Sequence, residues 1–194
     1  MPKSLASTSP KPVAGERGVM AGWDPAWSVV NLRGNPDDPD FRAGVARALG
    51  AELPVAVCST RLGQDLKIVW AGPDDWFVMS KRRKASELEA ALRAELAGQH
   101  IAVTDVSSNY TILHLSGPRV RELLAQGCPL DLHPRSFKTG QSAGSVFFKA
   151  SVWLLQTDDA PVYELLVRNS FRGYVWLMLE HCTAESGLVK RVFA

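Results

Sequence analysis

The sequence contains little cysteine and no long apolar run. Its three cysteines, Cys58, Cys128 and Cys182, lie far apart and form no CxxC pair, so neither a disulfide framework nor a cysteine-rich metal site is expected. No segment approaches the roughly 18–20 apolar residues that span a membrane, and the N-terminus lacks the apolar core of a secretory signal. These absences predict a cytoplasmic protein without a membrane partner.

A strong net charge and the common ligand-binding motifs are also absent. The net charge of +2 is too small to indicate the basic face that binds nucleic acid, so no nucleic-acid partner is expected. The dinucleotide pattern GxGxxG and the P-loop pattern are missing. Cys128 and His133 are five residues apart, and a structural role is favoured for both because a buried cysteine behaves as a small apolar residue.

The composition is that of a folded chain: 46% of the residues are hydrophobic and 22% are charged. Residues 1–22 are rich in Pro, Ser, Ala, Lys and Gly and are predicted to form a flexible arm. Residues 23–194 are predicted to form a single α+β domain, because helical and strand patterns alternate along them.

Hydrophobic periodicity gives the expected elements of this domain. The strands are expected at 27–34, 66–72, 76–80, 100–108, 110–117, 142–150, 151–159 and 161–169, and the helices at 40–49, 84–98, 117–127 and 170–182. Asp40 is the expected N-cap of the first helix. Leu88, Leu92 and Leu96 are spaced by four and mark the apolar face of the second.

Two stretches of the chain repeat the same order of features. Residues 31–54 resemble residues 114–134, since each runs from a strand through Gly and Pro into a helix that ends at Gly. Residues 70–96 resemble residues 156–182, since each has an acidic turn between strands and then a long helix. This repetition predicts a duplicated fold of two split βαββαβ halves.

The boundary between the halves is expected near residue 108, so the halves cover about 23–108 and 109–194. Helices set against mostly antiparallel strands place the fold in the α+β class.

The stretch "DVSSNYTILHLSGP", residues 105–118, holds an acid, two serines and a histidine. On a strand with a rise of roughly 3.3 Å per residue, Ser108 and His114 would lie about 20 Å apart, too far for a nucleophile and its base. Ser107, Ser108 and Asp105 therefore fit a turn better than a catalytic site.

Two charged runs have a functional and a structural interpretation. Asp158 and Asp159 suit a metal or acid–base site, but their place between two strands favours the tip of a hairpin. "KRRK", residues 81–84, suits an anionic partner, but such a run is more often a solvated turn.

The chain is rich in tryptophan, with residues Trp23, Trp27, Trp70, Trp76, Trp153 and Trp176. Trp70 and Trp176 lie on apolar elements and are expected in the core. Trp23 and Trp27 lie beside the predicted arm, where contact with a partner and contact with the chain itself are both open, because tryptophan is enriched at interfaces.

Three segments carry a resemblance to a known family. "AGPDDWFV" (71–78), "VTDVSSNYTILHLSGPRVRELLAQGCPLDLHPRSF" (103–137) and "TDDAPVYELLVRNSFRGYVWLML" (157–179) resemble the gamma subunit of heterotetrameric sarcosine oxidase. The resemblance extends over about residues 28–182. That family is in turn similar to the folate-binding fold of the glycine-cleavage aminomethyltransferase, through "DVS", a strand into "GP" and the helix after it. The resemblance implies a duplicated α+β fold.

The same resemblance implies that this chain has no aminomethyltransferase activity. In the aminomethyltransferases an acidic residue on a strand assists folate chemistry. The corresponding segment here is "KASVWLLQ", residues 149–156, where Trp153 and Leu154 stand near the expected carboxylates. The chain is therefore expected to carry no catalytic, cofactor-binding or metal-binding residues.

What the resemblance implies for function is a role inside a complex. Its partners would be alpha, beta and delta subunits, with NAD and tetrahydrofolate on alpha, FAD on beta, FMN at the alpha–beta boundary and zinc on delta. The complex would oxidise sarcosine to glycine, giving hydrogen peroxide and formaldehyde or 5,10-methylenetetrahydrofolate, with gamma as an assembly subunit. A complex that acts on another N-methyl amine, and a stand-alone folate-binding protein, remain as alternatives.

Overall fold

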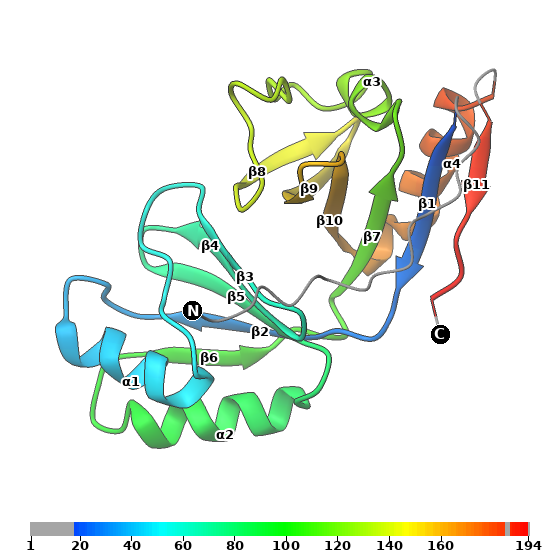
Figure 1. Cartoon of the computed structure of the whole chain (residues 1–194). Helices are drawn as coiled ribbons and strands as arrows, with labels where there is room; N and C mark the ends of the chain where they lie inside the picture. The colour runs from blue at the N-terminus through cyan, green and yellow to red at the C-terminus, as the bar shows by residue number, and fades with distance from the viewer. Residues whose placement is uncertain (1–17, 185–186, 194) are drawn as a thin grey trace, which may run out of the picture.

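Two β-sheets stack on each other and helices cover their outer sides (Figure 1). This computed structural model describes residues 18–184 and 187–193. The elements are β1 (Val19–Asp24), β2 (Ser28–Arg33), α1 (Pro39–Leu49), β3 (Thr60–Leu62), β4 (Leu66–Gly72), β5 (Asp75–Ser80), α2 (Ala85–Glu95), β6 (Ala102–Asp105), β7 (Tyr110–Ser116), α3 (Val120–Ala125), β8 (Ser142–Phe147), β9 (Ala150–Asp158), β10 (Val162–Arg168), a 3₁₀ turn (Asn169–Phe171), α4 (Arg172–Cys182) and β11 (Leu188–Lys190).

The strand orders of the two sheets confirm the predicted α+β class and its duplication. The five-stranded sheet has the order β3-β4-β5-β2-β6, with all neighbours antiparallel. The six-stranded sheet, read from its other edge, has the order β8-β9-β10-β7-β1-β11. Strands β7 to β11 thus repeat β2 to β6 in the same order, and each unit has one helix after its first strand and another after its fourth.

The second sheet differs from the first by one inserted strand. Strand β1 lies between β7 and β11, antiparallel to β7 and parallel to β11. The predicted arm, residues 1–22, is therefore wrong over residues 19–22, which form this strand and are buried or nearly so; the rest of the arm, up to residue 17, lies outside the described residues. Pairing with β7, from the middle of the chain, and with β11, from its C-terminal part, stabilises a segment that has no strand pattern of its own.

Alternation along the strands divides the core into three layers. One outer layer joins the five-stranded sheet to α1 and α2, and it contains Leu32, Trp76 and Leu92. The other outer layer joins the six-stranded sheet to α3 and α4. The inner layer lies between the sheets and includes Phe77 and Leu155. The molecule is thus a stack of helix, sheet, sheet and helix layers.

Local signals account for most element boundaries. The N-cap of α1 is Asp38 rather than the predicted Asp40, because the Asp38 carboxylate accepts the N–H of Asp40 at 2.8 Å and Pro39 fills the first helical position. Leu88 and Leu92 are fully buried on α2, as their spacing predicts. Within the described residues, no helix combines the length and the apolar character needed to cross a bilayer.

Candidate functional site

A charged pair joins the two sheets in the inner layer. Lys67 on β4 and Glu164 on β10 are 97 residues apart, yet Lys67 Nζ donates to Glu164 Oε2 at 2.5 Å. Their side chains are 8% and 9% exposed. Alternation explains why both point inward: Ile68 and Leu165, their neighbours in sequence, face the outer layers. The pair therefore connects the two halves of the fold through a buried ionic contact.

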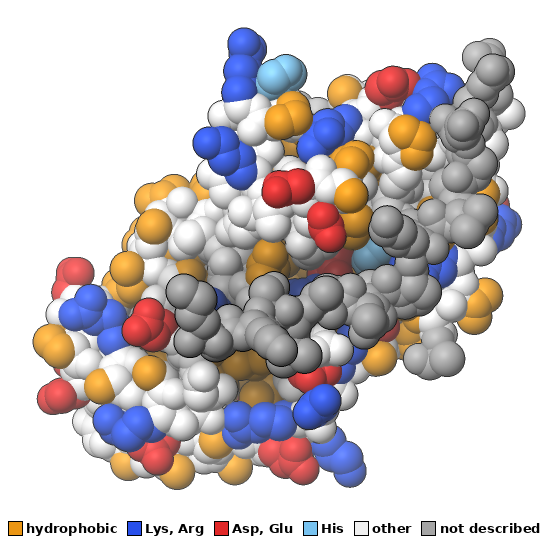
Figure 2. Space-filling model, in the orientation of Figure 1, with side chains coloured by type: hydrophobic (Ala, Val, Ile, Leu, Met, Phe, Trp, Pro, Cys, Tyr) orange, Lys and Arg blue, Asp and Glu red, His pale blue; other side chains and the backbone are white. Residues whose placement is uncertain are grey.

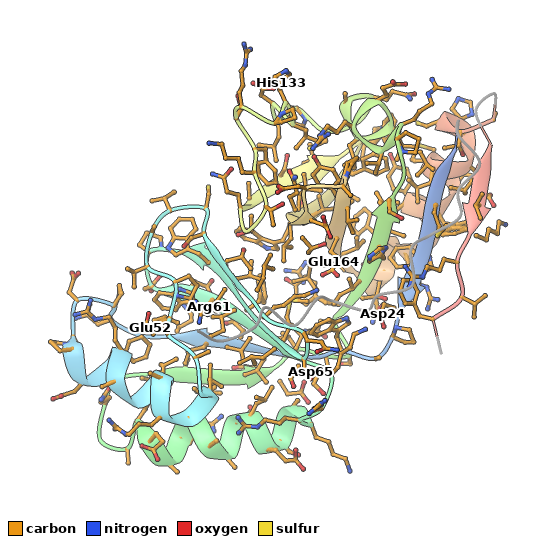
Figure 3. The ribbon with its side chains drawn as sticks, viewed as in Figure 1. Asp24, Glu52, Arg61, Asp65, His133 and Glu164 are labelled. Atoms are coloured by element: carbon orange, nitrogen blue, oxygen red, sulfur yellow. The ribbon has the colours of Figure 1, made fainter. Side chains whose placement is uncertain are left out.

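A second charged pair lies beside the first, with a tryptophan between them. Lys81 Nζ lies 2.8 Å from Asp24 Oδ2. The Trp27 ring lies 4.3 Å from Lys67 Nζ and 5.0 Å from Lys81 Nζ, measured to its centre, so both ammonium groups contact the negative face of one ring. Trp27 Nε1 donates to Asp24 Oδ2 at 3.0 Å. Two ion pairs thus lie beside one indole, and Figure 3 places Glu164 and Asp24 in this region between the sheets.

The carboxylate of Asp24 is held in its ionised form. Burial on its own would raise the pKa of Asp24, but hydrogen bonds from the Lys81 ammonium, the Ala26 N–H and the Trp27 indole outweigh burial and lower it. Asp24 is 5% exposed. A buried aspartate with three donors is a structural anchor, because its lone pairs are already occupied.

His114 completes the cluster as a neutral side chain. It lies opposite Glu164 in the register of β7 and β10. Burial lowers the pKa of His114 to about 4; the Glu164 and Asp24 charges raise it, while Arg191 and Lys67 lower it further. Its Nδ1 atom is buried and meets no hydrogen-bond partner among the described residues. The imidazole is thus uncharged near neutral pH.

The C-terminal residues cover this histidine. The Arg191 N–H donates to the carbonyl of Ala21 at 2.7 Å, and the Phe193 ring centre lies 5.4 Å from that of His114. This path crosses β1 at Gly22, where a Cβ atom would lie 2.2 Å from the Arg191 carbonyl oxygen. Glycine is therefore required at this crossing, because any side chain would displace the C-terminal segment.

The contacts of these residues suit a structural role better than a catalytic one. Lys67, Lys81, Asp24 and Glu164 each have an oppositely charged partner, and His114 lies against Phe193. None of the five combines exposure with a nearby nucleophile, which a reacting centre would need. Among residues 18–184 and 187–193, no group of three or more His, Cys, Asp or Glu side chains is placed to hold a metal ion.

Comparison with known proteins decides the family. The model of the "Sarcosine oxidase, gamma subunit family" matches residues 33–185, most of the chain.

This chain belongs to the sarcosine oxidase gamma subunit family.

Individual relatives agree with that membership. The gamma subunit of sarcosine oxidase from Corynebacterium sp. (strain P-1) is 33% identical over 153 residues, which cover 77% of this chain and 73% of the relative. The gamma subunit from Corynebacterium sp. (strain U-96) is 31% identical over 181 residues, covering 89% of this chain and 85% of the relative. The resemblance noted in the sequence is thus confirmed, and with it the expectation that the protein is part of an oxidoreductase.

Solved structures extend the likeness to the fold. A chain of the heterotetrameric sarcosine oxidase from Corynebacterium sp. U-96, solved with pyrrole 2-carboxylate, superposes with a TM-score of 0.82 at 28% identity, covering 94% of this chain and 91% of that one. The glycine cleavage aminomethyltransferase T from Bartonella henselae superposes with a TM-score of 0.66 at 13% identity, over 90% of this chain and 48% of that one. The second match shows a shared fold only.

In this gamma-family chain the serines of the "DVSS" segment lie in a turn. Ser107 Oγ accepts the Val29 N–H at 2.9 Å and donates to the Asp105 carboxylate at 2.6 Å. Ser108 is exposed, and His114 lies on β7 in the inner layer, so the structure does not bring them together. The turn interpretation of these residues is the one that the contacts support.

The basic run, residues 81–84, contributes contacts within the gamma-family chain. Besides the Lys81 pair, Arg82 Nε lies 2.9 Å from Asp65 Oδ2, and Arg83 donates to the carbonyl of Ala48 at 2.8 Å. The expectation of a merely solvated turn is therefore incomplete. Basic and acidic side chains are interspersed on the surface over α1 and α2 (Figure 2).

The remaining candidates have structural contacts. Asp158 and Asp159 lie at the hairpin tip between β9 and β10, where Asp159 accepts the Thr139 hydroxyl at 2.7 Å. His133 Nδ1 accepts the Arg135 N–H, and Cys128 Sγ lies 3.5 Å from Ser145 Oγ. The two tryptophans beside the predicted arm contact the chain itself, since the ring centres of Trp23 and Trp176 lie 6.3 Å apart and Trp27 is buried in the cluster.

Sequence reasoning missed the residues that carry the cluster. Lys67 lies in "LKIVWAG" and Glu164 in "VYELLVR", each as a charged residue between hydrophobic neighbours inside a strand. Such isolated charges are seldom buried unless they are paired. This pattern is the signal that would have marked both positions as partners of a buried contact.

Proposed function

We propose that this chain is the gamma subunit of a heterotetrameric sarcosine oxidase, and that its role there is assembly rather than catalysis. The observation that carries the proposal is the likeness to a chain of the Corynebacterium sp. U-96 enzyme over 94% of this sequence. The expected partners are alpha, beta and delta subunits, and the expected compartment is the cytoplasm. The free thiols Cys58, Cys128 and Cys182 support a reducing location.

The proposed reaction belongs to the whole complex. Sarcosine would be oxidatively demethylated to glycine, with hydrogen peroxide and either formaldehyde or 5,10-methylenetetrahydrofolate as products. FAD, FMN, NAD, zinc and tetrahydrofolate would be held by the other subunits. This division of labour is supported by the inner layer of this chain, where Lys67, Lys81, Asp24 and Glu164 are occupied by one another.

Co-expression tests the proposal. The chain, tagged at one end, is produced together with the other three subunits from the same genome and purified through its tag. We expect a complex of equal stoichiometry that consumes oxygen when sarcosine is added. Elution of the chain alone, in the presence of the three expressed subunits, would contradict the proposal.

The alternatives are separated by two further measurements. Oxygen uptake by the complex on a panel of N-methyl amines identifies its preferred substrate, and a preference for another amine would replace sarcosine in the proposal. Titration of the isolated chain with tetrahydrofolate is expected to release no heat, whereas saturable binding would favour a folate-binding protein.

The non-catalytic role has its own test. Ser108→Ala in the assembled complex is expected to leave the turnover number unchanged, because this exposed serine makes a side-chain hydrogen bond only to Asn109 within the described residues. A loss of turnover in a complex of normal stoichiometry would assign this chain a part in the reaction.

A further inference from the structure

Strand β8 leaves one side of its backbone without a strand partner. It lies at the edge of the six-stranded sheet and pairs with β9 alone. The N–H of Ser142 points away from β9, since it donates to the carbonyl of Cys58 at 2.8 Å. In an antiparallel pair the outward direction repeats every second residue, so the N–H and C=O groups of Gly144 and Val146 also point outward. Within the described residues, no backbone group bonds to them.

This edge lacks the usual protection against strand pairing. Edge strands in self-contained proteins are commonly short, charged or interrupted by proline. The other edge strands, β3, β6 and β11, have three or four residues each and carry Arg61, Asp105 and Lys190. Strand β8 has six residues, "SAGSVF", with neither charge nor proline. Val146 is 38% exposed at this edge.

A hollow beside the free edge of β8 is lined in part by aromatic side chains. Its volume is about 240 Å³, and Tyr110, Ser151, Trp153 and Arg168 are among the residues that line it. The Trp153 ring extends beneath Gly144 toward the free edge, since a Cβ atom on Gly144 would lie 2.9 Å from that ring. Phe77 from the other sheet closes the inner side, with its ring centre 5.8 Å from that of Trp153.

We propose that the free edge of β8 receives an extended segment of a partner subunit, which adds a strand to this sheet and places an apolar side chain on Trp153. This inference rests on the proposed function, which requires a surface that faces another subunit. An added strand would lie about 4.8 Å from β8, so its residue opposite Gly144 would reach the Trp153 ring.

The contacts also define the chemistry of the occupant. Evenly spaced outward N–H and C=O groups match an extended backbone and no other secondary structure. Ala143, Gly144 and Ser145 are at least partly exposed, and they offer no charge for an ionic partner. Arg168, exposed and stacked 5.3 Å from the Tyr110 ring centre, disfavours a basic side chain in the hollow. The occupant is therefore an uncharged extended segment with an apolar side chain at its centre.

Val146→Pro tests the backbone part of this inference in the co-expressed complex. Proline removes one outward N–H that has no partner within the described chain, so the isolated variant should fold, because proline is tolerated where an edge N–H faces solvent. The partner carbonyl would lose its donor, and we expect about tenfold weaker retention of the other subunits on the tagged chain. Val146→Thr, which keeps the N–H and the branched shape, is the matched control and should assemble like the unchanged protein.

Ser151→Arg provides a second test of the inference, which does not depend on the backbone of β8. Ser151 is exposed in the hollow, so the larger side chain fills the hollow without entering the core. We expect a similar loss of assembly. Amide hydrogen exchange at Gly144 and Val146, whose N–H groups point outward, should also slow at least tenfold when the unchanged chain enters the complex.

The outcomes separate the two proposals. If the unchanged chain forms no complex, the proposed function fails. If the complex forms and both Val146→Pro and Ser151→Arg assemble normally, with no slowing of exchange at Gly144 and Val146, the β8 inference alone is overturned. If the isolated chain forms a dimer that Val146→Pro dissociates, the edge binds a second copy, and the partner-subunit assignment is overturned.

Discussion

The outer layers of the molecule and its inner layer are built from different side chains. The outer layers are mainly apolar, with leucines from α1 and α2 on one sheet and those from α3 and α4 on the other. The inner layer is apolar around Phe77 and Leu155, but at its other end it buries Lys67 with Glu164. Apolar layers tolerate small shifts between their elements, whereas a buried ion pair is satisfied in one placement of the two sheets. Burial of apolar side chains thus stabilises each half, and the Lys67–Glu164 ion pair sets how the two sheets face each other.

Breaking the inner ion pair should have the largest effect. Lys67→Met leaves the Glu164 carboxylate buried without its cation, and we expect a loss of about 4 kcal/mol in the free energy of unfolding. Replacing both residues, Lys67→Met with Glu164→Leu, should restore most of that loss, because no unpaired charge remains. Urea unfolding of the single and double variants measures both. If the double variant lost as much free energy of unfolding as the two single variants together, pairing would be refuted as the cause.

An outer-layer substitution should cost slightly less. Leu92→Ala removes a fully buried side chain between α2 and the five-stranded sheet, with an expected loss of about 3 kcal/mol. The loss should be the same at pH 7 and pH 5, since no ionisable group takes part. A matched change on the exposed face of α2, Ala94→Ser, should alter the free energy of unfolding by less than about 0.5 kcal/mol.

The inner layer should also make stability depend on pH. The folded pKa of His114 is about 4, below its usual 6.5, so between these values the unfolded chain binds a proton that the folded chain does not. Stability is therefore complete above pH 6.5 and falls as the pH drops toward 4, by about 2–3 kcal/mol. Glu164, Lys67, Arg191 and Asp24 face this imidazole.

His114→Gln measures that contribution. Glutamine does not titrate, so the variant should lose less stability than the unchanged protein between pH 6.5 and 4, as followed by thermal unfolding at several pH values. His100→Gln is the control, because His100 is exposed, and it should leave the pH profile unchanged. Equal profiles for His114→Gln and the unchanged protein would show that His114 is protonated in the fold.

The smallest effect is expected in the turn that connects β6 of one sheet to β7 of the other. Ser107→Ala removes the oxygen that accepts the Val29 N–H, and we expect a loss of about 1 kcal/mol. Hydrogen exchange at Val29 should accelerate, whereas exchange at Leu92 should change only by the global loss. If exchange at Val29 and at Leu92 accelerated equally, and by more than the global loss of stability explains, the turn would unfold together with the core.

Much of the fold was predictable because its signals are local. Turn residues such as those at 73–75 and 158–161, and the leucine spacing of α2, specify elements without reference to the rest of the chain. The repeated order of these signals also gave the duplication, which the two strand orders confirm. The helix predicted at 40–49 begins one residue earlier in the structure, at Pro39, because Asp38 and Asp40 are equally good caps in sequence.

The charged cluster and strand β1 were not predictable in the same way. Nothing along the chain indicates that Lys67 meets Glu164, since the contact exists only once the two sheets pack. Strand β1 contains Gly22 and reads as part of a polar arm, yet β7 and β11 supply its hydrogen bonds. Both features depend on residues distant in sequence, where pairing rather than propensity decides the structure.

The insertion of β1 has a consequence for synthesis on the ribosome. Strands β2 to β6 and their helices form a continuous stretch, residues 28–105, so the five-stranded sheet can close while the rest of the chain is still being made. Strand β1 emerges before them, but its neighbours β7 and β11 emerge much later, and β11 is the last strand described. Strand β1 therefore stays unpaired until β7 has been translated, and its second neighbour, β11, joins it only after α4 has followed.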